Sequence, residues 1–171
     1  VSEFDTLAEY KDDIRKKLTE RKEKEARTAK ENAAVDKVIE NAQMEIPDAM
    51  INTQISQMLD DFSRRMQAQG LTMEQYFQFT GMTADKMREE MKPQALKRIQ
   101  TRLVLEKIAE TENIQPTDEE VNEEISKMAE MYKMEADKLK ELLGDRELEQ
   151  MKKDMAVQKA VTLVADEAKE A

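Results

Sequence analysis

Residues 70–83 read GLTMEQYFQFTGMT, and this stretch holds two of the three glycines and three of the seven aromatic residues in the chain. Glycine readily adopts the left-handed backbone conformation that commonly ends a helix, so Gly70 and Gly81 predict two helix ends. Thr72 and Gln75 have the spacing of a capping box, in which each side chain bonds the other residue's backbone N–H. The stretch therefore predicts a short helix between two longer ones, at the turn of a helical hairpin.

The composition predicts an all-α protein. Ala, Glu, Lys, Leu, Met and Gln dominate the 171 residues, whereas three glycines, three prolines and 4% aromatic residues leave little material for a many-stranded sheet. Charged residues make up 39% of the chain, against a norm of roughly 25%. We therefore expect an extended body with thin hydrophobic cores.

The N-terminal part of the chain predicts one long helix over residues 6–43. Thr6 and Glu9 have capping-box spacing, and apolar residues recur at helical intervals near both ends of the range. Between these stripes, residues 20–32 (ERKEKEARTAKEN) are almost wholly polar. No heptad pattern continues through this middle segment. We therefore favour a solvated spacer that joins two packed ends, and not a coiled-coil strand.

Helix signals continue on both sides of the 70–83 stretch. Pro47 predicts the first turn of a helix that carries an apolar stripe and ends at Gly70. Thr83 predicts the start of a fourth helix that extends to about residue 112, with a kink at Pro93. A capped fifth helix follows Thr117, a short one covers residues 136–143 and ends at Gly144, and a last one extends to residue 168.

Several kinds of catalytic and metal site are excluded by the residues present. The chain has no cysteine and no histidine, which removes disulfides, the usual zinc ligand sets and Ser-His or Cys-His nucleophiles. No glycine is preceded by the ligands of an EF-hand loop, and no phosphate-binding loop sequence occurs. We expect no enzyme, no catalytic residue, no cofactor and no metal site.

The charge and hydropathy patterns narrow the range of partners. The net charge is −10, of which −8 falls in residues 112–171, so we expect no nucleic acid partner. No run of about 18 apolar residues occurs and the N-terminus has no signal-peptide pattern, which predicts a soluble protein without a membrane partner. The chain begins without methionine, and we expect it to be part of a longer protein.

The thirteen methionines suggest a binding surface. All of them lie between Met44 and Met155, and nine fall in residues 58–91 and 128–134. Methionine fills irregular cores and is also over-used on surfaces that accept many partners. Core packing is the simpler interpretation for any single methionine. However, residues 128–134 (MAEMYKM) hold more methionines than one helix face buries easily, so we expect some to be exposed and to bind unfolded apolar segments.

Four segments, in order along the chain, resemble the C-terminal domain of bacterial trigger factor. They are VSEFDTLAEYKDDIRKKL (1–18), IPDAMINTQISQML (46–59), QGLTMEQYFQFTG (69–81) and RLVLEKIAETENIQPTDEEV (102–121). The resemblance implies one all-helical domain over residues 1–171, similar in fold to SurA, with an elongated body and two protruding arms that form a cradle. In this division, residues 1–45 are a long connecting helix, 46–112 a first arm with a body helix, and 113–171 a second arm with a terminal helix.

The same resemblance implies a function. Members of this family act as ATP-independent chaperones in the cytoplasm, where they bind unfolded or nascent polypeptides, prevent their aggregation and assist folding or export. We call such a bound polypeptide a client. Ribosome docking and prolyl isomerase activity belong to preceding domains of the family, outside these 171 residues.

Carried over to this sequence, the resemblance implies client-binding side chains on both arms. The first-arm candidates are Met58, Phe62, Met66, Met73, Tyr76, Phe77, Phe79, Met82, Met87 and Met91, and the second-arm candidates are Met128, Met131, Tyr132, Met134, Leu139 and Leu142. Met82 stands where the family often has lysine, which makes this tip more apolar. Among the aromatic residues we expect Tyr76 or Phe77 to pin the tip against Met66 or Met87, which leaves another ring to contact a client.

A second hypothesis is a helical spacer or assembly module. Its apolar patches would pack on one fixed protein partner or on a second copy of the chain. Scattered patches bind clients independently, whereas a fixed interface saturates at one stoichiometry. Weak self-association is compatible with both hypotheses, because exposed apolar surface can bind itself.

Overall fold

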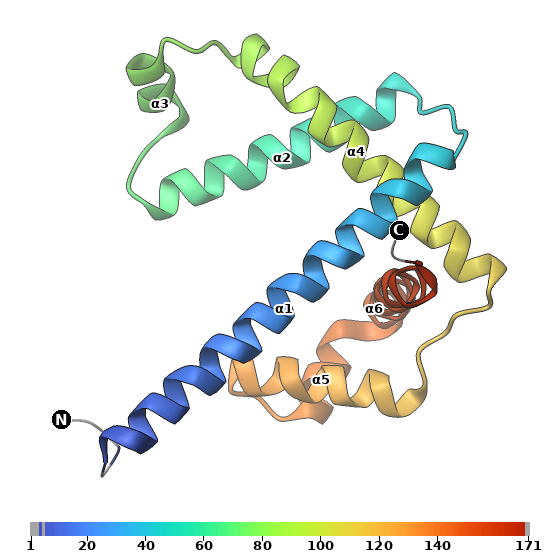
Figure 1. The fold of residues 1–171 in the computed structure, drawn as a ribbon. Helices are drawn as coiled ribbons and strands as arrows, with labels where there is room; N and C mark the ends of the chain where they lie inside the picture. Colours follow the sequence, from blue (N-terminus) through green and yellow to red (C-terminus); the bar gives the residue numbers. More distant parts are fainter. Residues whose placement is uncertain (1–3, 5, 170–171) are drawn as a thin grey trace.

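The computed structural model describes residue 4 and residues 6–169, and this range contains six α-helices and no strand. The helices are α1 (Leu7–Asn41), α2 (Asp48–Ala68), α3 (Met73–Thr80), α4 (Ala84–Thr111), α5 (Asp118–Tyr132) and α6 (Ala136–Glu167). In Figure 1, α2 and α4 form a hairpin with α3 at its far end, and α5 pairs with α6 on the other side of α1. The predicted all-α class is confirmed.

The protein is elongated. It exposes 13330 Å² of surface, whereas a compact protein of 19.8 kDa exposes roughly 8600 Å² by the usual scaling with mass. Figure 1 shows the N-terminal half of α1 and the tip of the α2–α4 hairpin projecting on the same side of the body. The expected long N-terminal helix and protruding arms are therefore present.

Local signals in the sequence define most helix ends. Thr6, Thr72 and Thr117 each accept a bond from the backbone N–H three residues later, and all three form complete capping boxes. Gly70 and Gly81 adopt left-handed conformations with φ of 77° and 67°. These ends were predicted correctly because each depends on contacts within about five residues.

The backbone at Pro47, Pro93 and Gly144 sets where α2 begins and where α4 and α6 continue or break. Pro47 is the residue that caps α2 and not the first helical residue, because its ψ of 142° is extended. α4 continues through Pro93 as one helix. Gly144 has φ of 68° and ψ of 172°, which divides α6 into the short helix and the longer one that the sequence predicts on either side of it.

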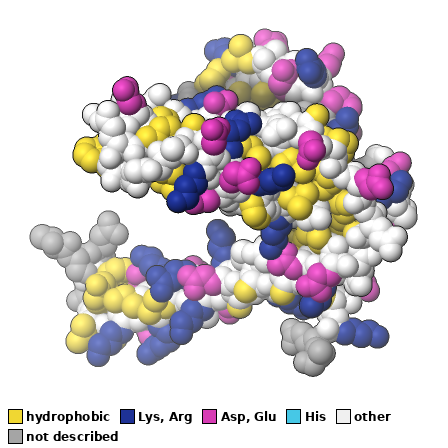
Figure 2. Space-filling view, turned by 90° about the horizontal axis from the view of Figure 1, so that it is seen from above, with side chains coloured by type: hydrophobic (Ala, Val, Ile, Leu, Met, Phe, Trp, Pro, Cys, Tyr) yellow, Lys and Arg dark blue, Asp and Glu magenta, His cyan; other side chains and the backbone are white. Residues whose placement is uncertain are grey.

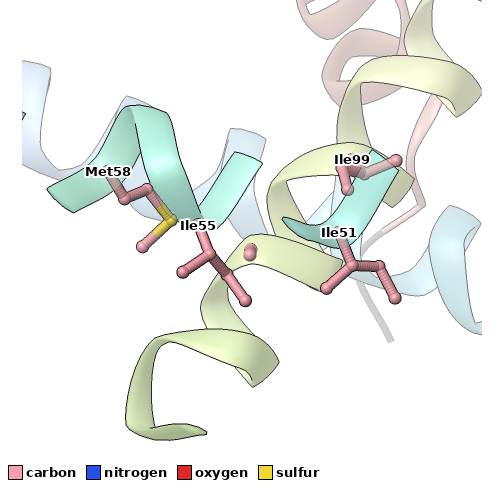
Figure 3. Close-up of a cluster of buried hydrophobic side chains, with 5 residues drawn as sticks. Ile51, Ile55, Met58 and Ile99 are labelled. Atoms are coloured by element: carbon pink, nitrogen blue, oxygen red, sulfur yellow. The ribbon is translucent and has the colours of Figure 1, made fainter. Parts of the chain in front are cut away.

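The hydrophobic core is divided into three small clusters. The first joins α2 to α4 (Figure 3), the second joins α1, α4 and α6, and the third joins α5 to α6. Their buried members are Ile51, Ile55, Met58, Ala95 and Ile99 in the first, Val35, Leu105, Ala109 and Ala160 in the second, and Val121, Ile125, Ala129 and Leu139 in the third. We call α2–α4 the first hairpin and α5–α6 the second hairpin.

Candidate functional site

The tip of the first hairpin is held in place by its own aromatic residues. The Tyr76 ring of α3 lies edge-on to Phe62 of α2, with a centroid distance of 5.2 Å, and Phe77 lies 6.0 Å from Tyr76. Such edge-to-face pairs stabilise by about 0.5–1.5 kcal/mol beyond their burial. Phe79, on the same short helix, is 79% exposed. The tip thus uses Tyr76 for packing and presents Phe79 to solvent.

The tip of the second hairpin presents more exposed large apolar side chains than the first. α5 ends at Tyr132, and the left-handed backbone of Lys133 turns the chain into the following short helix. Around this turn, Met131 is 76% exposed, Leu142 is 72% exposed and Tyr132 is 62% exposed. Met134 is also exposed. These side chains lie among many charged ones, and Figure 2 shows hydrophobic surface in separate patches between acidic and basic side chains.

The other predicted client-binding residues are less accessible. Met58, Met87 and Leu139 are buried, so the protein itself covers these three predicted residues in this structure. Eight more are only partly buried: Phe62, Met66, Met73, Tyr76, Phe77, Met82, Met91 and Met128. We call Phe79, Met131, Tyr132, Met134 and Leu142 the exposed set.

A further apolar stripe lies on the N-terminal half of α1. Leu7, Tyr10, Ile14 and Leu18 recur at spacings of three and four residues, and all four are exposed. The sequence predicted that this stripe packs, and this is wrong within the described chain. The helical spacing marked the stripe as apolar, but spacing alone says nothing about whether another helix covers it.

The grooves of the molecule do not coincide with the predicted residues. A groove of about 970 Å³ lies between the end of α4, the start of α5 and α6, and polar side chains such as Asn113, Glu149 and Lys153 line it. None of the predicted client-binding residues lines this groove. The described residues contain no group of three or more acidic, histidine or cysteine side chains that could hold a metal ion. Residues 4 and 6–169 also contain no helix long and apolar enough to cross a membrane.

Comparison with known proteins assigns the family. A family model described as the C-terminus of the bacterial trigger factor protein matches residues 6–166. The chain belongs to the trigger factor family. Trigger factor from Lachnoclostridium phytofermentans is 61% identical over 99% of this chain, and that from Agathobacter rectalis is 54% identical over 97%.

These trigger factors are longer than the chain, which spans 40% and 38% of their lengths. A solved structure of trigger factor domains from Thermotoga maritima has the same fold, with a TM-score of 0.60 and 22% identity. The match covers 84% of this chain and 83% of the solved one. The agreement in fold extends over most of the helices described above.

Ion pairs link the two helices of the second hairpin to each other and to α1. Lys159 of α6 donates to both carboxylate oxygens of Glu120 in α5, at 2.8 and 2.7 Å. Arg27 of α1 donates to Asp166 of α6 at 2.8 Å. The hydrogen bond from Lys159, together with the one from the Thr117 backbone N–H, lowers the pKa of Glu120 below its usual value. The contact thus links the start of α5 to the terminal helix.

The Glu120–Lys159 pair predicts a pH-dependent contribution to stability. The pKa of Glu120 is lower in the folded than in the unfolded protein. The stability that this carboxylate contributes is therefore fully present above its pKa in the unfolded protein, and it is lost as the pH falls through its pKa in the folded protein. We expect Glu120→Gln to lower the urea midpoint at pH 7, with a difference from the wild type that shrinks below about pH 4.

The matched control for this prediction is Glu119→Gln. Glu119 lies in the same first turn of α5 but makes no ion pair to α6 in the described structure. Its substitution removes the same charge from the helix N-terminus without breaking the link to Lys159. If the urea midpoints of the wild type and Glu120→Gln differ by the same amount from pH 7 to pH 3, the stabilisation does not come from the lowered pKa of Glu120, and the prediction is contradicted.

Proposed function

We propose that this chain is an ATP-independent chaperone module that binds unfolded or nascent polypeptides through the exposed set at the ends of its two hairpins. The observation that carries the proposal is the exposure of Phe79, Met131, Tyr132 and Leu142, each more than 60% exposed. Large apolar side chains placed together at the tips of projecting elements mark interaction sites on soluble proteins. Membership of the trigger factor family supports the same function.

The number and kind of exposed side chains favour weak, reversible binding. Full burial of one such side chain stabilises a complex by about 1.5–3 kcal/mol, and the loss of translational, rotational and side-chain freedom on binding opposes it. Several contacts shared between two tips therefore give an affinity nearer the micromolar range, which corresponds to about 8 kcal/mol. Methionine adapts its shape to different neighbours, so the second tip suits clients of unrelated sequence.

We extend the proposal to the cellular setting, which membership of the trigger factor family supports. The chain acts in the cytoplasm, prevents aggregation of its clients and assists their folding or export. Contact with the ribosome is assigned to another domain of the longer protein. The proposal gives residues 6–166 a role in binding and none in catalysis.

The direct test is suppression of aggregation. The chain, in molar excess over a chemically denatured client diluted into buffer without ATP, should reduce light scattering in a dose-dependent manner. An acidic helical protein of similar net charge is the control, since it reproduces charge effects without the exposed set. Scattering equal to that of the control at every ratio would overturn the proposal.

The exposed stripe on α1 favours one alternative function. Leu7, Tyr10, Ile14 and Leu18 form a continuous helical face, as expected for a spacer that packs on one fixed partner or on a second copy. Light scattering over a concentration series distinguishes the two functions. A persistent dimer that is lost with Tyr10→Ala and Ile14→Ala, in a chain that binds no client, would favour the assembly role.

A further inference from the structure

We infer that residues 134–143 form a lid over the apolar cluster of the second hairpin, and that an apolar client segment binds in the methionine-edged groove that opens when the lid is displaced. This inference rests on the proposed function and adds to it a second, covered binding site. The lid consists of the end of the turn after α5 and the short first part of α6.

Both ends of the lid have backbone conformations suited to a hinge. Lys133 precedes it with φ of 54° and ψ of 43°, and Gly144 follows it with φ of 68° and ψ of 172°. The second conformation is essentially restricted to glycine. A Cβ at Gly144 would meet only the flexible end of Glu147 at 3.6 Å. The glycine is therefore required by the direction of the chain and not by close packing.

The lid is attached by few contacts. Leu139 is its buried residue, and Ala136 and Leu143 pack partly against the same cluster. The ion pair from Lys138 joins only Glu135, within the lid, at 3.3 Å. The described structure shows no side-chain hydrogen bond or ion pair from the lid to α5 or to residues 145–167. Glu135, which caps the lid helix, provides no side-chain capping bond.

The surface beneath the lid can adapt to another occupant. Val121, Ile125 and Ala129 of α5 form its buried floor. The partly buried residues around that floor are Met128, Leu148, Met151 and Met155. Unbranched methionine side chains repack around different shapes at little cost. The buried side chains of α5 therefore give the groove a fixed floor, whereas the methionines at its edge can repack around an occupant.

The lid itself indicates what the groove binds. Leu139 and Leu143 are four residues apart, so both lie on one face of the short helix. The matching client segment is apolar, with two large aliphatic side chains three or four residues apart. Leu142, on the exposed edge of the lid, gives such a segment its first contact.

Hydrogen exchange of the full 171-residue chain, followed by mass spectrometry of peptides, tests the hinge. Without client, residues 134–143 should exchange faster than residues 118–132 and 145–167. Gly144→Ala should raise the exchange rate of residues 134–143 about tenfold and leave α5 unchanged, because it strains the closed hinge. Gly81→Ala is the matched control, since Gly81 also has positive φ but lies on the first hairpin. Equal exchange of 134–143 and α5 in all three proteins would show that the hairpin opens as one unit and would overturn the lid.

Client binding is tested with a permanently unfolded probe, a reduced and carboxymethylated protein, at saturating concentration. The inference predicts faster exchange in residues 134–143 together with slower exchange in residues 121–129. Slower exchange in 134–143 would overturn the inference, because it means that the client binds on top of a closed lid. If the probe changes no exchange rate anywhere in the chain, the proposed function fails and the covered site fails with it, whereas the hinge result is unaffected.

Discussion

Ile125→Ala is expected to lower the free energy of unfolding of the second hairpin by about 2–5 kcal/mol, the range for large-to-small substitutions in cores. Ile125 is 2% exposed and is the largest fully buried side chain among the described residues. Its cluster has only four buried members, so few neighbours remain to close the cavity. Urea unfolding followed by circular dichroism measures the loss, with an earlier transition for the second hairpin than for the rest.

The control for Ile125→Ala is Leu142→Ala on the same hairpin. Leu142 is mostly exposed, and surface substitutions usually change stability by less than about 0.5 kcal/mol. The two variants remove similar amounts of apolar side chain from positions that differ in burial. Equal losses of stability in both would contradict the division of the second hairpin into a buried cluster and an exposed tip.

The combined substitution of Phe79, Met131, Tyr132 and Leu142 by alanine is expected to weaken binding of an unfolded client by about tenfold or more. A tenfold change corresponds to about 1.4 kcal/mol, which is less than the burial energy of one large apolar side chain. Because all four residues are exposed, the helical content and the unfolding midpoint should remain close to those of the wild type. Fluorescence anisotropy of a labelled, permanently unfolded client measures the dissociation constant.

A polar variant provides the comparison for this experiment. Gln78→Ala combined with Asn122→Ala changes exposed positions of α3 and α5 that carry no large apolar side chain. We expect it to bind the client with the affinity of the wild type. Similar weakening by both variants would mean that binding depends on general surface properties and not on the exposed set.

The helix ends could be predicted because they are local. Thr72 and Gln75 form their capping box within four residues, and Gly81 reverses the chain by its own backbone conformation. Such signals act before any tertiary contact forms. The sequence therefore predicted the order of the helices and the break at Gly144, together with the all-α class.

The exposure of each apolar residue could not be predicted, because it depends on how distant helices pair. Met58 and Met66 lie on the same stripe of α2, yet only Met58 is buried, in the cluster with Ala95 and Ile99. Leu139 and Leu142 are three residues apart, and only Leu139 faces α5. The stripe on α1 has the same spacing as a packed face and remains exposed. Helical spacing identifies apolar faces but does not identify their partners.

Client polypeptides should contact the exposed set and leave the side chains buried within the first hairpin untouched. Methyl resonances of ¹³C-labelled methionine distinguish these positions, since the thirteen methionines include both exposed and buried side chains. On titration with a permanently unfolded client, we expect shifts for Met131 and Met134 and unchanged resonances for Met58 and Met87. Unmoved resonances for Met131 and Met134 at saturating client would contradict this expectation.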